Sequence, residues 1–106
     1  MNTATYINDS EFDTLLTSET VFVVDCTASW CGPCKKISPL IDQLAEEYQD
    51  RVKVVKLDIS ENKETATKFS IRSIPAVMFF KSSELVENVI GVSPYETYKT
   101  ALDKLL

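Results

Sequence analysis

The sequence predicts a single α/β domain over residues 1–106, in which four helices flank a central mixed sheet of five strands. Strand-like apolar segments alternate with segments of helical periodicity, in the order β-α-β-α-β-α-β-β-α. Only residues 81–83 separate the last two strand segments, which indicates an antiparallel hairpin. Alternating strands and helices are typical of right-handed parallel crossovers, so the hairpin is expected to add an antiparallel edge.

The expected strands follow from their composition. Residues 20–26 form a nearly continuous apolar run, which is typical of a strand buried on both faces, and 51–59 predicts a second buried strand. The other three expected strands are residues 3–7, 76–80 and 84–90.

The first expected helix spans residues 9–18, with Asp9 or Ser10 as its N-cap. Its apolar face consists of Phe12, Leu15 and Leu16. Ser93, Pro94 and Glu96 predict a capping box, with proline at the first position, for the last helix. The residues that face the core from that helix are Tyr98, Ala101, Leu102 and Leu105.

The longest expected helix covers residues 33–48. Pro39 lies inside it and removes one backbone donor, so it is expected to kink the helix without ending it. Its apolar positions are Ile37, Leu40, Ile41, Leu44 and Tyr48. A short polar helix is expected over 61–70, with Ala66 and Phe69 facing inward.

Composition excludes several classes of protein. The formal net charge is −5, and no basic face is available for nucleic acid or an anionic membrane. The apolar runs are too short to span a bilayer. The N-terminus lacks the pattern of a secretory signal, and three cysteines do not make a disulfide framework. We therefore expect a reducing, cytoplasmic location, or an organelle if a targeting segment has been removed.

The stretch TASWCGPCKK, residues 27–36, carries two of the three cysteines. Cys31 and Cys34 lie between the end of a buried strand and the start of the long helix, where free N–H groups and the helix dipole favour an anion. The pKa of the Cys31 thiol is therefore expected to fall from about 8.5 to about 7. Cys34, one turn further in, is expected to be more buried and to keep a higher pKa.

This arrangement predicts thiol–disulfide exchange. Cys31 attacks a substrate disulfide, and Cys34 resolves the mixed disulfide by attacking Cys31. Gly32 leaves room for a substrate chain and Pro33 stiffens the loop. A structural zinc needs four ligands, and the chain has no histidine and one further cysteine, so only a cluster shared between two chains stays open. A structural staple is disfavoured because so short a loop constrains little of the unfolded chain.

The motif Trp-Cys-Gly-Pro-Cys after FVVDCTAS, the segment IRSIPAVMFF, Pro39 and Gly91 together resemble the thioredoxin family over the whole chain. The resemblance implies the thioredoxin fold, a protein-disulfide reductase and no bound cofactor beyond the Cys31–Cys34 disulfide. It implies disulfide-containing target proteins and an external thioredoxin reductase, either an NADPH-dependent flavoprotein or a ferredoxin-linked enzyme. We expect a monomer.

Asp25 ends an apolar strand run and is expected to lie beneath the cysteine loop. An isolated carboxylate there is costly to ionise, so its pKa is expected to rise toward neutrality. Spacing alone leaves two roles open, a proton acceptor for Cys34 and an ordinary turn aspartate. The resemblance favours the acceptor, with Lys56 as the lysine that accompanies it. A solvated strand-end lysine is the alternative for Lys56.

Pro75 follows Ile74 just before a strand. Base rates favour a trans bond, but the resemblance implies a cis-proline facing the cysteines, with the Ile74 backbone as a docking edge for an extended substrate chain. An apolar rim around Cys31 would comprise Trp30, Pro33, Ile74, Ile90, Gly91 and Val92. Taken singly, Ile90 and Val92 fit core packing better, and Gly91 is expected to permit close approach of the partner backbone.

The sequence departs from the common thioredoxin pattern at Cys26, Thr27, Ala76, Ser82 and Ser83. Adjacent strand residues face opposite sides, so Cys26 is expected to point away from Asp25 as a buried, inert thiol. A regulatory thiol is the alternative for Cys26.

Two other functions use the same residues. A thiol oxidase or isomerase would need a more oxidising couple, which Gly-Pro between the cysteines and the lack of a secretory signal disfavour. A redox-independent binding subunit would tolerate the loss of Cys31.

Overall fold

The computed structural model describes residues 4–106, so residue 3 of the expected first strand lies outside the described residues. The element order is the expected one. The strands are β1 (Thr5–Ile7), β2 (Val21–Thr27), β3 (Lys53–Asp58), β4 (Ala76–Lys81) and β5 (Glu84–Ile90). The helices are α1 (Asp9–Ser18), α2 (Gly32–Glu47), α3 (Lys63–Lys68) and α4 (Tyr95–Asp103). No helix in this part of the chain is long and apolar enough to cross a membrane.

The five strands form one mixed sheet in the order β1-β3-β2-β4-β5. Strand β3 pairs with β1 and β2 in parallel, whereas β4 is antiparallel to both β2 and β5. The expected hairpin is confirmed, but the expectation of parallel crossovers throughout is wrong for the connection from β3 to β4. Helix α3 has six residues and rises only about 9 Å, which is too short to carry the chain back along a strand of about 20 Å.

This reversal brings three segments to one end of the sheet. Cys26 pairs with Ala76, which pairs in turn with Ile90. The chain that leaves β2, the chain that enters β4 and the chain that leaves β5 therefore meet at the same end of the sheet. The cysteine loop and Pro75 lie at this end.

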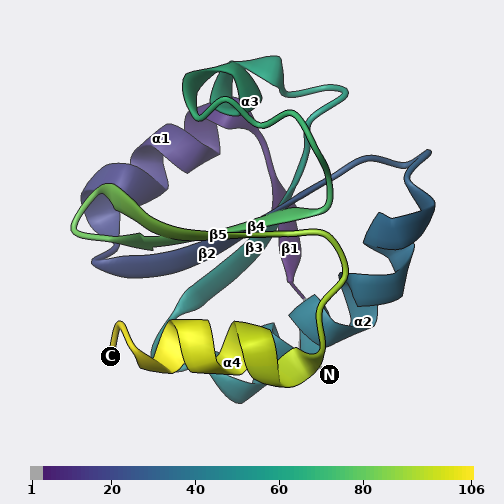
Figure 1. Ribbon diagram of the computed structural model, residues 1–106. Helices are drawn as coiled ribbons and strands as arrows, with labels where there is room; N and C mark the ends of the chain where they lie inside the picture. The colour runs from purple at the N-terminus through teal and green to yellow at the C-terminus, as the bar shows by residue number, and fades with distance from the viewer. Residues whose placement is uncertain (1–3) are drawn as a thin grey trace.

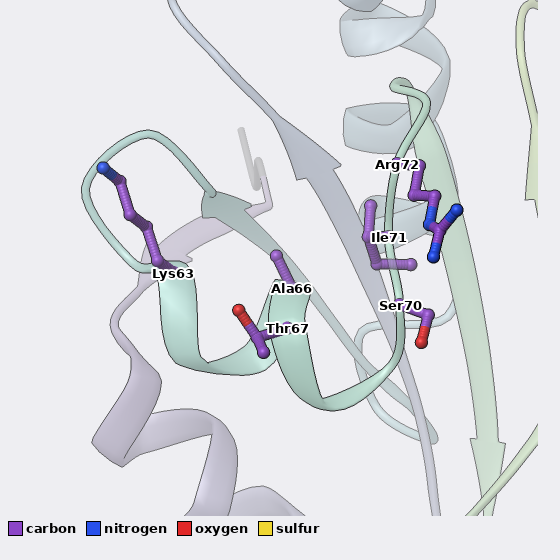
Figure 2. Close-up of a pocket in the computed structure, with 6 residues that line it drawn as sticks. All are labelled: Lys63, Ala66, Thr67, Ser70, Ile71 and Arg72. Carbon is purple, nitrogen blue, oxygen red and sulfur yellow. The ribbon is translucent and has the colours of Figure 1, made fainter.

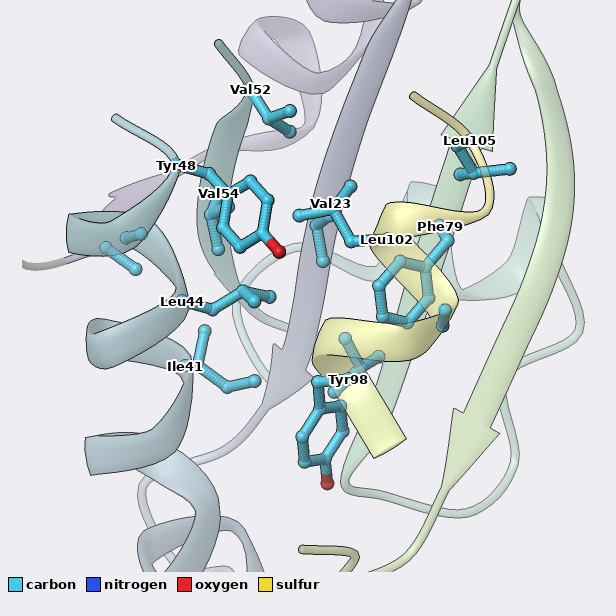
Figure 3. Close-up of a cluster of buried hydrophobic side chains, with 14 of the residues drawn as sticks. Val23, Ile41, Leu44, Tyr48, Val52, Val54, Phe79, Tyr98, Leu102 and Leu105 are labelled. Carbon is cyan, nitrogen blue, oxygen red and sulfur yellow. The ribbon is translucent and has the colours of Figure 1, made fainter. Parts of the chain in front are cut away.

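Helices cover both faces of the sheet, with α1 and α3 on one side and α2 and α4 on the other (Figure 1). Between the sheet and α2 and α4, Val23, Leu44 and Phe79 interdigitate with Leu102 (Figure 3). Tyr98, Ala101, Leu102 and Leu105 are all buried, as predicted. On the opposite face, the ring of Phe12 makes edge-to-face contacts with the rings of Phe22, Phe69 and Phe80.

The predicted caps need correction. Asn8, and not Asp9 or Ser10, caps α1: its side chain accepts the N–H of Glu11 at 2.8 Å, and the Glu11 carboxylate accepts the N–H of Asn8. Asp9 instead accepts the N–H and hydroxyl of Thr65 in α3, a buried residue that the sequence pattern did not single out. Asn8 is favoured because Glu11 lies three residues after it, the spacing of a capping box.

The capping box predicted for the last helix is also wrong. Helix α4 begins at Tyr95 with Pro94 as its N-cap, and no side chain caps it. Proline has no side-chain acceptor, and the N–H of Thr97 bonds to the Pro94 carbonyl oxygen instead.

Two other local predictions hold. Helix α2 continues through Pro39 to Glu47, as its apolar spacing indicated; the kink itself stays a prediction. Residues Ser82 and Ser83 connect β4 to β5 with φ of 52° and 69°. Two consecutive positive φ values are the geometry of a type I′ turn, which accounts for so short a link.

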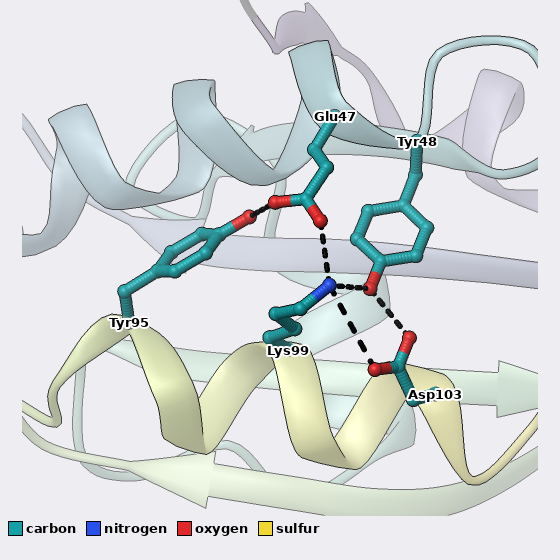
Figure 4. Close-up of polar contacts among 5 residues, drawn as sticks. All are labelled: Glu47, Tyr48, Tyr95, Lys99 and Asp103. Carbon is teal, nitrogen blue, oxygen red and sulfur yellow. Dashed lines mark hydrogen bonds and ion pairs between the residues drawn. The ribbon is translucent and has the colours of Figure 1, made fainter.

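A polar cluster joins the end of α2 to α4 on the surface of the fold (Figure 4). The ammonium of Lys99 contacts Glu47 at 2.5 Å, the Tyr48 hydroxyl at 2.9 Å and Asp103 at 3.8 Å. The hydroxyl of Tyr95 donates to Glu47. These contacts fasten α4 to α2 over the buried cluster of Figure 3.

Candidate active site

Cys31 and Cys34 form a disulfide at the start of α2, with their Cα atoms 5.3 Å apart. Cys31 is the N-cap residue and Pro33 lies in the first turn. Both cysteines are buried in this oxidised form, Cys34 slightly more than Cys31, as expected. Gly32 and Pro33 are exposed between them, and a Cβ at Gly32 would meet no atom within 4 Å.

The Sγ atom of Cys31 accepts the backbone N–H of Cys34 at 3.2 Å. This is the N-cap hydrogen bond, with sulfur as the acceptor in place of oxygen. An N–H directed at Sγ, together with the helix dipole, favours negative charge on Cys31 once the disulfide is reduced. The local geometry therefore agrees with the expectation of a thiolate at Cys31.

The segment before β4 lies against the cysteines. The peptide bond between Ile74 and Pro75 is cis, as the family resemblance implied and the base rate did not. The Ile74 carbonyl oxygen lies 4.0 Å from Cys31 Sγ, and the half-buried Ile74 side chain packs on the two cysteines and on Ala28. The backbone of Ile74 therefore borders the sulfur atoms.

The apolar rim expected around Cys31 comprises Trp30, Pro33, Ile74, Ile90, Gly91 and Val92, of which Ile74 and Gly91 are half-buried. Trp30 is 70% exposed, Ile90 59% and Val92 54%. Core packing, the better interpretation of Ile90 and Val92 taken singly, is therefore wrong. Ile90 ends an edge strand and Val92 follows it in a loop, so apolar character alone did not indicate burial.

Gly91 has φ of +86°, a conformation that other L-residues rarely adopt. A Cβ there would meet no atom of the chain within 4 Å. The backbone conformation is therefore a sufficient reason for glycine at this position. Close approach of a partner chain stays a prediction.

Asp25 lies in the middle of the sheet and is 1% exposed. Its Oδ1 atom has no hydrogen-bond partner among residues 4–106. Burial raises the pKa of Asp25 to about 7, with the positive charge of Lys56 opposing the shift and the negative charge of Asp42 adding to it. The predicted shift toward neutrality is confirmed, and an ordinary solvated turn aspartate does not fit this position.

Lys56 is paired with Asp25 in the register of β2 and β3, so both side chains lie on the face covered by α2. It is 5% exposed, so the solvated alternative is wrong. Its ammonium bonds not to Asp25 but to Asp42 at 2.9 Å and to Ser38 at 2.7 Å. Sequence reasoning missed Ser38 and Asp42, although their spacing of four residues places them on one face of α2.

Cys26 is fully buried on the opposite face of the sheet, among residues packed under α1 and α3. Burial raises the pKa of its thiol to about 12, and the charge of Asp25 adds to the shift. The expectation of a buried thiol pointing away from Asp25 is confirmed.

A surface cavity beside α3 lies apart from the cysteines. It has a volume of about 370 Å³ and is lined by α3 and the segment after it, where Lys63 and Arg72 point away from each other (Figure 2). No group of three or more His, Cys, Asp or Glu side chains within residues 4–106 is arranged to hold a metal ion.

Comparison with known proteins agrees with this site. The family profile described as Thioredoxin matches residues 3–104. The chain is 46% identical to an M-type chloroplastic thioredoxin of Pisum sativum, over all of this chain and 62% of that protein. It is 40% identical to a thioredoxin of Synechocystis, over the full length of both.

A solved structure of a mutant thioredoxin from Halobacterium salinarum superposes with a TM-score of 0.87 at 30% identity, covering 97% of this chain and 90% of that one. The sheet, the four helices and the bonded Cys-Gly-Pro-Cys pair are those of a thiol–disulfide oxidoreductase. The chain belongs to the thioredoxin family.

Proposed function

We propose that this chain is a protein-disulfide reductase that acts by dithiol–disulfide exchange and so supports cellular redox homeostasis. The observation that carries the proposal is the Cys31–Cys34 disulfide at the start of α2, bordered by the Ile74 carbonyl and by the apolar rim. The bonded pair is the oxidised product of the cycle described below.

In the first step the Cys31 thiolate attacks one sulfur of a substrate disulfide. A bond forms between Cys31 Sγ and that sulfur, the substrate disulfide breaks, and the departing sulfur leaves as a thiolate that takes a proton from water. The N–H of Cys34, which points at Cys31 Sγ, stabilises the attacking charge before this step.

In the second step Cys34 resolves the mixed disulfide. Its thiol gives a proton to the Asp25 carboxylate, its sulfur bonds to Cys31 Sγ, and the substrate sulfur leaves as a thiolate. The substrate gains two electrons and the cysteine pair loses two. A carboxyl group with a pKa of about 7 is suited to this exchange, because it takes up and releases a proton near neutral pH.

Substrate binding would use the rim defined above, together with Gly32 and Pro75. The exposed side chains of Trp30, Ile90 and Val92 offer apolar contact to an extended chain. The backbone of Ile74 would pair with that chain as an added strand edge.

The partners follow from this chemistry. The substrates are disulfide-containing proteins, and a thioredoxin reductase dependent on NADPH or ferredoxin returns the pair to the dithiol. No bound cofactor takes part. We infer a monomer in the cytoplasm, or in an organelle if the chain is delivered there; the chloroplast relative fits the second location.

The proposal is tested with insulin as the disulfide substrate and dithiothreitol as the electron source. The wild-type chain should accelerate insulin reduction, and Cys31→Ser should abolish the acceleration. In a separate reaction from which dithiothreitol has been removed, the reduced Cys34→Ser variant should accumulate a mixed disulfide between Cys31 and an insulin chain, visible by intact mass under non-reducing conditions.

Cys26→Ser is the matched control, because it removes a thiol that lies on the other face of the sheet. It should turn over insulin like the wild type. Insulin reduction no faster with the wild type than with Cys31→Ser would contradict the proposal and favour a redox-independent binding subunit.

A further inference from the structure

Two side chains of α2 bind the ammonium of Lys56 in the layer between α2 and the sheet. The ammonium bonds to the Asp42 carboxylate at 2.9 Å and to the Ser38 hydroxyl at 2.7 Å, and both partners lie on one face of the helix. The Lys56 side chain is 6% exposed and that of Asp42 is 30% exposed. A buried ammonium needs a counter-charge, and Asp42 supplies it from the edge of the core.

The same ammonium is near Asp25 without bonding to it. Asp25 and Lys56 are directly paired between β2 and β3, so their side chains start from the same face of the sheet. No ion pair or hydrogen bond joins them within residues 4–106, and Asp25 Oδ1 has no partner there. The charge of Lys56 therefore lowers the pKa of Asp25 electrostatically, without a hydrogen bond between them, while the Lys56 ammonium is bound by residues of α2.

Few other ionisable groups surround Asp25. On β4 its paired neighbour is Val77, which carries no charge. Burial raises the pKa of the Tyr98 hydroxyl on α4, with a contribution from the charge of Asp25. The titratable and charged groups that face or adjoin Asp25 are Lys56 from β3, Asp42 from α2, Tyr98 from α4 and Cys26 beside it on β2.

We propose that Asp42 is a positioning residue for the exchange reaction: with Ser38 it holds the Lys56 ammonium toward α2 and so sets how readily Asp25 accepts a proton. This inference rests on the proposed role of Asp25 as proton acceptor. Without the charge of Asp42, the Lys56 ammonium would be free to stabilise the Asp25 carboxylate. Asp25 would then be a weaker base for the Cys34 thiol at neutral pH.

The test is a pH titration of the Asp25 carboxyl carbon by NMR in the oxidised protein, combined with the pH profile of mixed-disulfide resolution. In Asp42→Asn the Asp25 midpoint should move to lower pH, and the pH profile should move with it. Asp42→Glu should restore the wild-type midpoint. In Lys56→Met the Asp25 midpoint should move to higher pH. The shift that Asp42→Asn causes in the Lys56→Met background should be smaller than the shift it causes in the wild-type background.

Glu46→Gln is the matched control, because Glu46 is an exposed carboxylate of the same helix. It removes the same charge and should leave the Asp25 midpoint at the wild-type value. If Asp42→Asn does not fold, Ser38→Ala carries the test, since it removes one partner of Lys56 and leaves the ion pair intact. It should shift the midpoint in the same direction by less.

An unchanged Asp25 midpoint in Asp42→Asn, or in Ser38→Ala where that variant carries the test, would overturn the inference, as would an equal shift in Glu46→Gln. Failure of the proposed role of Asp25 looks different. In that case Asp25→Asn would resolve mixed disulfides at the wild-type rate, whatever Asp42 does to the titration.

Discussion

The backbone N–H of Gly91 donates a hydrogen bond to the carbonyl oxygen of Pro75 at 2.8 Å. This bond joins the chain that leaves β5 to the chain that enters β4, at the end of the sheet where the cysteines lie. Gly91 makes the bond with a positive φ. The two backbone segments of the rim are therefore held in one arrangement.

Gly91→Ala should weaken both stability and substrate binding. A Cβ at positive φ costs roughly 1 kcal/mol, and relief of that strain would disturb the bond to Pro75. We expect a lower free energy of unfolding in urea and a higher KM for insulin reduction. Gly32→Ala is the stability control, because its Cβ would meet nothing and its φ is not positive. Equal losses of stability in the two variants would contradict this account of Gly91.

Asp25 should make stability depend on pH. Its pKa is raised from 3.8 to about 7 in the folded protein, so the folded state favours the protonated carboxyl. The contribution of Asp25 to the free energy of unfolding is fully present below about pH 4, where the carboxyl is protonated in both states. It is lost as the pH rises from there through about 7, the pKa in the folded protein. The loss amounts to roughly 4 kcal/mol above pH 8, since each unit of pKa difference corresponds to about 1.4 kcal/mol.

Asp25→Asn should therefore gain stability relative to the wild type as the pH rises from 4 to 8. Urea unfolding of the oxidised proteins across this range measures the difference. Asp13→Asn, which changes an exposed carboxylate on α1, should run parallel to the wild type. A constant difference between Asp25→Asn and the wild type at all pH values would argue against the raised pKa.

The polar cluster between α2 and α4 should contribute to thermal stability. Lys99→Met removes the cation shared by Glu47, Tyr48 and Asp103, so its Tm should fall at pH 7. The hydrogen bond from Lys99 lowers the pKa of Glu47, so this stabilisation is present above the unfolded pKa and is lost in acid. The Tm difference should therefore shrink below pH 4.

Lys104→Met is the control for that experiment. Lys104 is exposed at the end of α4 and makes no ion pair with the described residues. Its removal should leave Tm nearly unchanged, and a fall equal to that of Lys99→Met would assign the effect to net charge.

Cys26 should be inert while the protein is folded. Its thiol is fully buried, and burial together with Asp25 raises its pKa to about 12, so almost no thiolate exists at pH 8. Iodoacetamide should leave the folded, oxidised protein unmodified and should add one carbamidomethyl group per chain in urea. Rapid labelling without urea would support the alternative of a regulatory thiol.

Local patterns predicted much of this molecule. Alternating apolar segments were sufficient for the order of elements, and the five-residue motif was sufficient for the cysteine pair. Burial of Asp25 followed from its place in an apolar strand. The antiparallel direction of β4 did not follow, because it depends on how far the short helix α3 can carry the chain.

The remaining differences arise from choices between equivalent local partners. Asn8, Asp9 and Ser10 are all suitable caps, and only the folded structure shows that Asp9 bonds to α3 instead. The apolar character of Ile90 and Val92 predicts core positions, but both are exposed because β5 is an edge strand. Lys56 has two carboxylates within reach of its charge, and tertiary packing decides that its ammonium bonds to Asp42.

The central claim, that Cys31 and Cys34 form a reducing dithiol couple, is tested most directly by a redox titration. The fraction of disulfide is measured by the fluorescence of Trp30, which adjoins Cys31, across glutathione or dithiothreitol buffers at pH 7. The account predicts one two-electron transition near the known value for thioredoxins, about −270 mV. A midpoint near −120 mV, the value of a strong oxidant, would contradict it and reverse the direction of electron flow.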